Sequence, residues 1–398
     1  MTALARPDLL RRRESHGPAR VTNVELFFDL VFVFAVTQLS HALLHDLTAG
    51  GALRTGFLFL AVWWVWIYTS WVTNWLDPER APVRLMLFAM MLAGLVLSTS
   101  IPEAFEAKGL AFAAAYALMQ VGRTGFTLWA IGPGHPELVR NFQRILTWLA
   151  LAAAFWIAGG VAEGGLRSLL WVIALGIEYV SPALGFRVPG LGRSTTGDWQ
   201  VEGAHLAERC ALFIIIALGE SILVTGASFA DMAWSGPTLA AFLVAFAGSV
   251  AMWWIYFDTG AERGTRRIAG SADPGRMARL GYTYLHLLIV GGIIADAVAA
   301  ELILAHPGEH AAAEAVAVIL GGPALYLLGN ALFKASFNQA RPGWPPLSHL
   351  VGLGLLALMA VVAAQAASRL ALGAATAGIL VLVAIWERLS LGSRQVTV

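Results

Sequence analysis

Long apolar runs alternate with short segments rich in glycine, proline and charged residues from about residue 20 to the end of the chain. A helix that crosses the hydrocarbon core of a bilayer needs about 20 mostly apolar residues. Twelve runs approach this length, so we predict an all-α, polytopic integral membrane helix bundle with about twelve spans. The predicted spans are roughly 24–45, 54–75, 83–101, 109–131, 143–162, 166–186, 206–229, 236–257, 279–300, 314–336, 347–367 and 371–391.

The composition agrees with this pattern. Hydrophobic residues make up 58% of the 398 residues and charged residues only 13%, with a mean hydropathy of +0.70. Soluble domains carry about 25% charged residues. The chain is therefore not a soluble globular protein, a disordered chain, a coiled coil or a nucleic-acid-binding protein, and we expect the lipid bilayer as its partner. The net charge of +1 indicates no other class of partner, and the single cysteine, Cys210, excludes a disulfide framework.

Basic residues are distributed unevenly between the predicted loops. With a cytoplasmic N-terminus, twenty of them lie on the cytoplasmic side and only Arg54, Lys108, Arg167 and Arg369 on the outer side. Cytoplasmic loops of membrane proteins carry an excess of Lys and Arg. We therefore predict an even number of spans with both termini in the cytoplasm. Residues 1–20 hold five arginines and no apolar stretch, so we expect an anchoring segment and no cleavable signal peptide.

The two halves of the chain resemble each other in four spans. The matching strings are the runs that begin at Glu25 and Glu208, residues 63–68 (WWVWIY) and 253–256 (WWIY), 84–85 and 279–280, and 122–123 and 329–330. Six spans per half give both halves the same orientation, so we predict two parallel six-span repeats. The predicted domains are a basic N-terminal segment (1–20), a first repeat (21–187), a cytoplasmic linker (188–204), a second repeat (205–391) and a cytoplasmic tail (392–398).

Ionisable residues inside the spans are the candidates for function, because each costs about 2.5 kcal/mol or more and usually faces a bundle interior or a water-filled cavity. In the first span, Glu25 and Asp29 are four residues apart and share one helical face, while Gln38 and His41 lie on nearly the opposite face. Such a helix belongs near the centre of the bundle. Two interpretations of Asp29 stay open: a structural ion pair with Arg123, or a functional carboxylate.

The seventh span repeats this arrangement. His205, Glu208 and Arg209 lie at its cytoplasmic mouth, and Glu220 and Ser221 lie in mid-membrane. A carboxyl group at that depth can carry protons, or it can pin two helices together through hydrogen bonds. Glu178, His286 and Asp296 are the candidate partners of Glu220.

No motif for catalysis or cofactor binding stands out. The sequence has no glycine-rich phosphate loop, HExxH helix or nucleophile elbow, and we attribute the two histidines of the loop 306–310 to a solvated segment. We therefore expect no enzyme activity, no cofactor and no metal. The candidate proton-binding residues are Glu25, Asp29, Glu208 and Glu220, and the supporting polar residues are Gln38, His41, Arg123, His205, Arg209, Ser221, His286 and Asp296.

Two strings resemble a known family. The first runs from Glu25 to Ala35 (ELFFDLVFVFA) and is followed by Gln38 and His41. The second is His205-x-x-Glu208-Arg209 followed by Leu-Gly-Glu-Ser at 218–221. Both resemble the bacterial low temperature requirement protein A (LtrA) family, over about residues 20–390. The resemblance implies a multi-pass protein of the bacterial inner membrane, with Glu25, Asp29, His205, Glu208, Arg209 and Glu220 as signature positions; the family is named for growth in the cold and not for a biochemical activity.

A fainter similarity concerns the first span alone. Asp29-x-Val31-Phe32-x-x-Ala35-x-Thr37-x-Leu39 is similar to the first-helix motif of the six-span potassium channels that lack a selectivity filter. The similarity implies that the first and seventh spans line a central path and that the protein forms a homodimer. The seventh span has Leu212 at the position where Asp29 would repeat.

Three classes of function follow from these patterns. We favour a proton-linked secondary transporter or ion conduit that uses buried carboxylates of the first and seventh spans, with protons, monovalent ions or a small solute as partners. The alternatives are a non-catalytic membrane component that supports growth in the cold, and a lipid-acting membrane enzyme with Glu25, His205 and Glu208 as acid–base groups. A structural component requires every buried polar group to be paired, whereas a transporter requires polar groups that solvent or a solute can reach.

Overall fold

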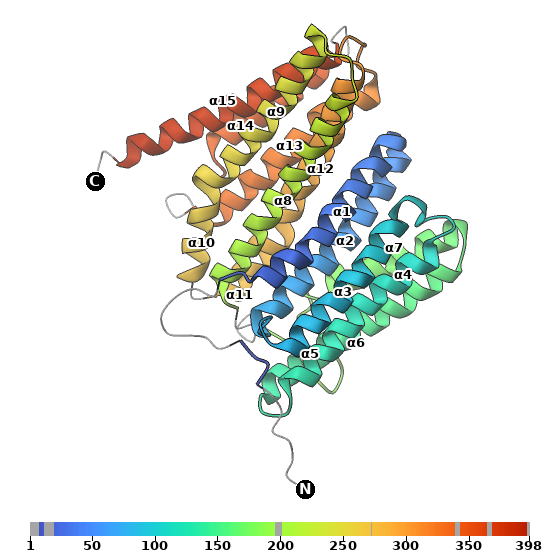
Figure 1. Ribbon diagram of the computed structural model, residues 1–398. Helices are drawn as coiled ribbons and strands as arrows, with labels where there is room; N and C mark the ends of the chain where they lie inside the picture. Colours follow the sequence, from blue (N-terminus) through green and yellow to red (C-terminus); the bar gives the residue numbers. More distant parts are fainter. Residues whose placement is uncertain are drawn as a thin grey trace. The chain divides into compact units, whose positions relative to one another are not determined.

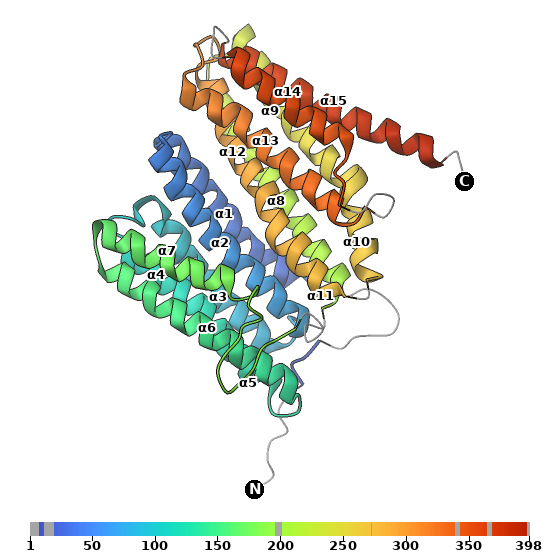
Figure 2. The ribbon, with the colours of Figure 1, turned by 180° about the vertical axis from the view of Figure 1, so that it is seen from behind.

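The computed structural model describes residues 8–11, 20–195, 201–271, 273–338, 343–363 and 368–395. Every regular element in these ranges is a helix, which confirms the all-α class. Figures 1 and 2 follow the chain from two opposite sides. The helices are α1 (Asn23–His45), α2 (Ala49–Trp75), α3 (Ala81–Ser100), α4 (Gly109–Ala117), α5 (Arg123–Ile131), α6 (Pro136–Val161), α7 (Gly164–Val180), α8 (Gly203–Ala230), α9 (Gly236–Tyr256), α10 (Glu262–Ala269), α11 (Pro274–Met277), α12 (His286–Ala305), α13 (Ala313–Ser336), α14 (Leu347–Ala363) and α15 (Arg369–Gln395).

Short helical turns of other types extend or join several of these helices. A 3-10 turn (Ile101–Glu103) prolongs α3, and π turns follow α4 (Leu118–Gly122), α9 (Phe257–Ala261) and α11 (Ala278–Leu285). A π turn places one extra residue in a helix and so rotates the side chains that follow it.

Nine helices of the described ranges are long and apolar enough to cross a membrane. They are α1, α2, α3 with its 3-10 turn, α6, α8, α9, the continuous segment Pro274–Ala305, α13 and α15. This confirms a multi-pass membrane protein. The other three predicted spans also fall on helices, but α4 and α5 are joined through a π turn, and α7 and α14 have only 17 residues each. The count of twelve spans therefore stays a prediction.

The chain divides into two compact units. The first holds residues 1–38, 60–209 and 272–276, and the second holds residues 39–59, 210–271 and 277–398. Helices α1, α2 and α8 each contribute residues to both units. The predicted repeats and their boundaries stay a prediction. Parts of the predicted N-terminal segment (1–7 and 12–19), linker (196–200) and tail (396–398) lie outside the described residues.

In the first unit, α4 packs against α3 and α6, and α6 packs against α7 (Figures 1 and 2). The helices approach closely where glycines face them: a Cβ at Gly160 would lie 2.9 Å from the Cβ of Ala113. Aromatic rings fill the interior, with ring centroids 4.4 Å apart for Tyr116 and Trp156 and 5.4 Å apart for Trp156 and Trp171. This packing positions the polar groups of α4, α6 and α7.

In the second unit, α12 and α13 form the most extensive helix pair, and α9 packs along α15. The α9 helix begins with a capping box in which Ser235 Oγ accepts from the backbone N–H of Thr238, 3.3 Å away, and Pro237 follows in the first turn. Gly292 and Gly322 allow α12 and α13 to touch backbone to backbone: a Cβ at Gly292 would lie 2.4 Å from the backbone nitrogen of Tyr326. Small residues at such contacts are typical of packed membrane helices.

Candidate functional site

The parts of α1 and α8 that belong to the first unit each present two ionisable side chains four residues apart. These are Glu25 and Asp29 on α1, and His205 and Arg209 on α8, and all four are fully buried. A spacing of four places each pair on one helical face. The faces meet in two steps: Glu25 Oε1 lies 2.9 Å from His205 Nε2, and Asp29 Oδ1 lies 2.7 Å from Arg209 Nη2. We call these four residues the charge ladder.

In the first step of the charge ladder, the pair Glu25 and His205, both carboxylate oxygens and both ring nitrogens have hydrogen-bond partners. Asn74 Oδ1 accepts from the backbone N–H of Glu202, and its amide nitrogen donates one hydrogen to the backbone oxygen of Glu202 (2.8 Å) and the other to His205 Nδ1 (3.2 Å). Because Nδ1 accepts, the hydrogen of the neutral ring lies on Nε2 and is donated to Glu25. Glu25 Oε2 accepts from the backbone N–H and the hydroxyl of Thr22, each 2.9 Å away, and from Arg11 at 3.3 Å. Both oxygens of Glu25 are therefore occupied.

The second step is only partly saturated. Asp29 Oδ1 accepts from Arg209 and from the indole N–H of Trp66, 2.8 Å away, and Arg209 Nη2 also donates to Ser70 Oγ at 3.3 Å. Three buried atoms of this pair have no hydrogen-bond partner: Oδ2 of Asp29, and Nε and Nη1 of Arg209. Buried polar atoms in native proteins almost always find a partner in protein or water. The Asp29–Arg209 pair, with three such atoms, is therefore a place in this unit where water or a solute would complete the bonding.

The predicted ion pair between Asp29 and Arg123 is not formed. Arg123 Nη1 donates to the backbone oxygen of Val65 (3.2 Å) and to Thr69 Oγ1 (3.1 Å), and its Nη2 donates to Gln120 Oε1 (2.5 Å). The reason is that Arg209, one turn beyond His205 on α8, already occupies the position facing Asp29. Arg123 belongs instead to a second polar cluster.

That cluster surrounds Glu178 on α7. Glu178 Oε2 accepts from Tyr116 (2.6 Å) and Gln120 (2.8 Å), and Oε1 accepts from the indole N–H of Trp156 (3.0 Å). Gln120 lies in the π turn between α4 and α5 and links Glu178 to Arg123. We call these five residues the Glu178 network. Both carboxylate oxygens are paired, so this network has the bonding expected of a structural element.

The remaining predicted residues lie elsewhere. Glu208 is exposed and accepts from the backbone N–H of Val21, 3.1 Å away, so it holds the segment before α1. Gln38 is half-buried, and His41 is exposed. Glu220 and Ser221 are buried on the part of α8 that belongs to the second unit.

Two of the three expected partners of Glu220 are bonded to other residues, and the third, Asp296, is bonded to none of the described residues. Glu178 lies in its own network, and His286 uses both ring nitrogens, with Nε2 2.7 Å from Tyr256 Oη and Nδ1 2.8 Å from the backbone oxygen of Gly281. That carbonyl belongs to the π turn before α12, where the helical hydrogen-bond pattern is altered. Asp296 forms no hydrogen bond or ion pair with any residue of the described ranges.

Sequence reasoning missed several participants. Arg11, Ser70 and Asn74 complete the charge ladder, and the polar spacing of Ser70 and Asn74 along one face of the second span was a usable signal. In the second unit, Lys334 lies near the end of the predicted span 314–336. It is buried on α13 and pairs with Glu387 of α15 at 2.6 Å.

The described residues offer no cluster of three or more His, Cys, Asp or Glu that could hold a metal ion. Glu309 of the loop 306–310 instead pairs with Arg369, 2.8 Å away. The charge ladder contains two carboxylates, an imidazole and a guanidinium within two helical turns. One of those carboxylates, Asp29, keeps an oxygen that no protein group occupies.

The family profile described as Bacterial low temperature requirement A protein (LtrA) matches residues 20–385, which is nearly the whole chain. The chain belongs to the LtrA family. An uncharacterized protein of Rhizobium meliloti (strain 1021) is 42% identical to it over 382 residues, which cover 96% of this chain and 92% of the relative. No solved structure matches the chain. The charge ladder and the Glu178 network are thus features of an LtrA protein, and the LtrA name itself states no substrate.

Proposed function

We propose that this LtrA protein is a proton-linked secondary transporter or ion conduit of the bacterial inner membrane, and that Asp29 is the residue that binds and releases the proton. The proposal rests on one observation: Asp29 Oδ2 and Arg209 Nε and Nη1 are buried atoms of one ion pair that no protein group satisfies. Leaving one such atom unsatisfied costs about 1–3 kcal/mol. A pair with three of them is suited to a site that water or a solute enters.

The two carboxylates of the charge ladder differ in how they would take a proton. Glu25 accepts hydrogen bonds on both oxygens, so protonation of either oxygen displaces a donor. Asp29 accepts only on Oδ1, so a proton on Oδ2 leaves the bonds from Trp66 and Arg209 in place. Asp29 can therefore change its charge without rearranging its neighbours. The change alters the charge balance next to Arg209, and this is how proton binding would be linked to movement of an ion or solute.

The Glu178 network supports the competing structural role for a different part of the same unit. Its carboxylate oxygens are fully paired, and Gln120 ties them to a buried arginine. Interhelical hydrogen bonds in membranes contribute about 0.6–2 kcal/mol each. This network holds α4, α6 and α7 together. The charge ladder is then the candidate site for transport in this unit.

The test is proton and potassium flux in proteoliposomes, read by internal indicators of pH and potassium under imposed gradients. We expect flux with the wild type and at least a tenfold lower rate with Asp29→Asn, which fixes the neutral form. Glu103→Gln is the control, because Glu103 is exposed and pairs with Lys108 at the surface. Absence of flux in the wild type under both gradients would overturn the proposal for these ions, and equal flux in wild type and Asp29→Asn would overturn the assignment of Asp29.

A further inference from the structure

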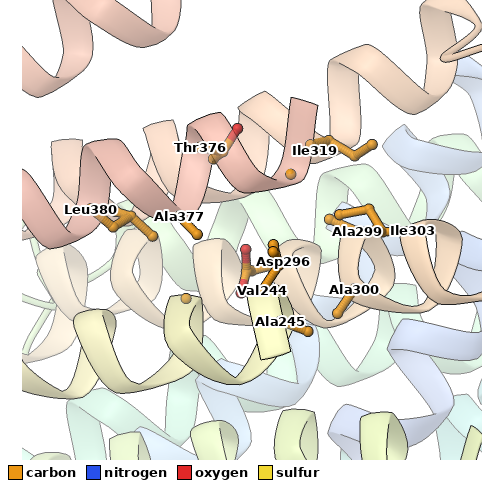
Figure 3. Close-up of a pocket in the computed structure, with 12 residues that line it drawn as sticks. Val244, Ala245, Asp296, Ala299, Ala300, Ile303, Ile319, Thr376, Ala377 and Leu380 are labelled. Atoms are coloured by element: carbon orange, nitrogen blue, oxygen red, sulfur yellow. The ribbon is translucent and has the colours of Figure 1, made fainter. Parts of the chain in front are cut away.

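A small cavity in the second unit contains a carboxyl group that no other residue binds. The cavity measures about 20 Å³ and is lined by residues of α9, α12, α13 and α15, Asp296 of α12 among them. Figure 3 shows Asp296 between Val244 and Ala245 on one side and Thr376 and Ala377 on the other. All these residues belong to the second unit, so the cavity is formed by that unit alone.

The cavity exists because small residues line it. Besides Asp296 and Thr376, its lining consists of aliphatic residues and glycines, and Gly248 is an example. Gly248 is buried, yet a Cβ built on it would meet no atom within 4 Å. Thr376 donates its hydroxyl hydrogen to the backbone oxygen of Leu372, 2.8 Å away, and its oxygen still has a lone pair.

No described cation neutralises Asp296. On α13, Tyr326 interacts electrostatically with Asp296, but its hydroxyl donates to the backbone oxygen of Met252. On α15, Glu387 pairs with Lys334, and Arg369 pairs with Glu309. The α9 residues that line the cavity carry no ionisable group, and on α12 itself His286 is bonded to Tyr256 and Gly281.

The size and polarity of the cavity restrict what Asp296 can bind. A volume of this size holds about one water molecule. Metal cations need several oxygen ligands, whereas the side chains here supply one carboxyl group and one hydroxyl group. A proton needs only the carboxyl group. We propose that Asp296 is a second proton-binding site, which exchanges its proton through the water-sized cavity beside Gly248.

This site is separate from the charge ladder, and its test needs no transport activity. Infrared difference spectra of the reconstituted protein between acid and alkaline pH report each carboxyl group that titrates. We expect a carbonyl stretch from a protonated carboxyl group in an apolar setting, replaced by carboxylate bands at alkaline pH. On an Asp29→Asn background, which removes the proton-binding aspartate of the charge ladder, the band should be lost in Asp296→Asn and kept in Asp231→Asn, a control at an exposed aspartate of the same unit. An unchanged band in Asp296→Asn would overturn the proposal.

Two measurements keep the proposal testable even where Asp296→Asn fails to fold. Labelling the aspartate side chains of the Asp29→Asn protein with carbon-13 should shift the band, and the absence of a shift would overturn the assignment to an aspartate. Gly248→Ala adds a methyl group at a position with open space, so the protein should fold and the cavity should shrink. We expect exchange of the carboxyl hydrogen in heavy water to become at least tenfold slower. An unchanged exchange rate would exclude this cavity as the route.

Discussion

At the scale of single residues, the charge ladder shows how buried charges are tolerated in a membrane protein. Glu25 is stabilised by four donors, whereas Asp29 relies on Arg209 and Trp66. Removing one partner of a buried ion pair typically costs about 3–5 kcal/mol, because the other charge stays buried without compensation. The Asp29–Arg209 pair should therefore be strongly coupled.

We expect a double-mutant cycle to reveal this coupling. Arg209→Met should lower the free energy of unfolding by about 3–5 kcal/mol, and adding Asp29→Asn should restore about 1–3 kcal/mol of the loss. Denaturant unfolding in detergent micelles measures these differences. The matched cycle at Glu103 and Lys108, an exposed pair with 2.7 Å between its atoms, should give a coupling below about 1 kcal/mol. Equal coupling in the two cycles would contradict this account.

The residues of the charge ladder could be identified from sequence, but their pairing could not. The spacing of four in Glu25 and Asp29, and again in His205 and Arg209, marked two polar helix faces. Which faces meet depends on how α1, α2 and α8 pack, and Arg123 was an equally plausible counter-ion by depth alone. Asp296 was identified as polar and intramembrane, but its lack of a partner depends on the small residues of three other helices.

At the scale of helices, close packing between α12 and α13 depends on individual glycines. We expect Gly322→Ala to lower the free energy of unfolding by about 1–3 kcal/mol, because its Cβ would lie 2.7 Å from the backbone nitrogen of Asp296. The neighbouring Gly321→Ala is the matched control, since a Cβ there meets nothing within 4 Å. It should be neutral or stabilising by up to about 1 kcal/mol. The same unfolding assay compares the two, and a similar effect of both variants would contradict the packing described.

Each of the two units contains a buried cation that donates to a backbone oxygen. In the first unit, Arg123 donates to the backbone oxygen of Val65, and in the second, Lys334 donates to that of Ile255. In each unit the cation is also linked to a buried glutamate, through Gln120 to Glu178 or directly to Glu387. These contacts support an origin by duplication, which stays a prediction.

At the scale of the whole molecule, the sequence predicted the membrane class from composition and most helices from apolar runs. The predicted span 166–186 extends beyond the end of α7 at Val180. The helix ends there because Ser181 and Pro182 follow, and proline cannot continue a helix. The division into two units could not be predicted from periodicity, since it separates residues within α1, α2 and α8. Periodicity marks which face of a helix is apolar, and not which neighbours that helix has along its length.

The distribution of basic residues predicts the sidedness of the loops. Cysteine labelling tests it, because Cys210, the single cysteine, is buried. On a Cys210→Ala background, Lys108→Cys should react with a membrane-impermeant maleimide in right-side-out vesicles. Glu79→Cys, at the other end of α3, should react only after permeabilisation. Both positions are exposed, and reaction of both from the same side would contradict a cytoplasmic N-terminus with the predicted spans.

The measurement that tests the central claim most directly compares two fully buried carboxylates of the first unit in the same proton-flux assay. Asp29 keeps an oxygen that no protein group binds, whereas both oxygens of Glu178 are paired. We predict that Asp29→Asn abolishes proton flux into proteoliposomes and that Glu178→Gln, once folded, retains at least half of the wild-type rate. Loss of flux in Glu178→Gln with retention in Asp29→Asn would contradict the assignment of the charge ladder as the proton site.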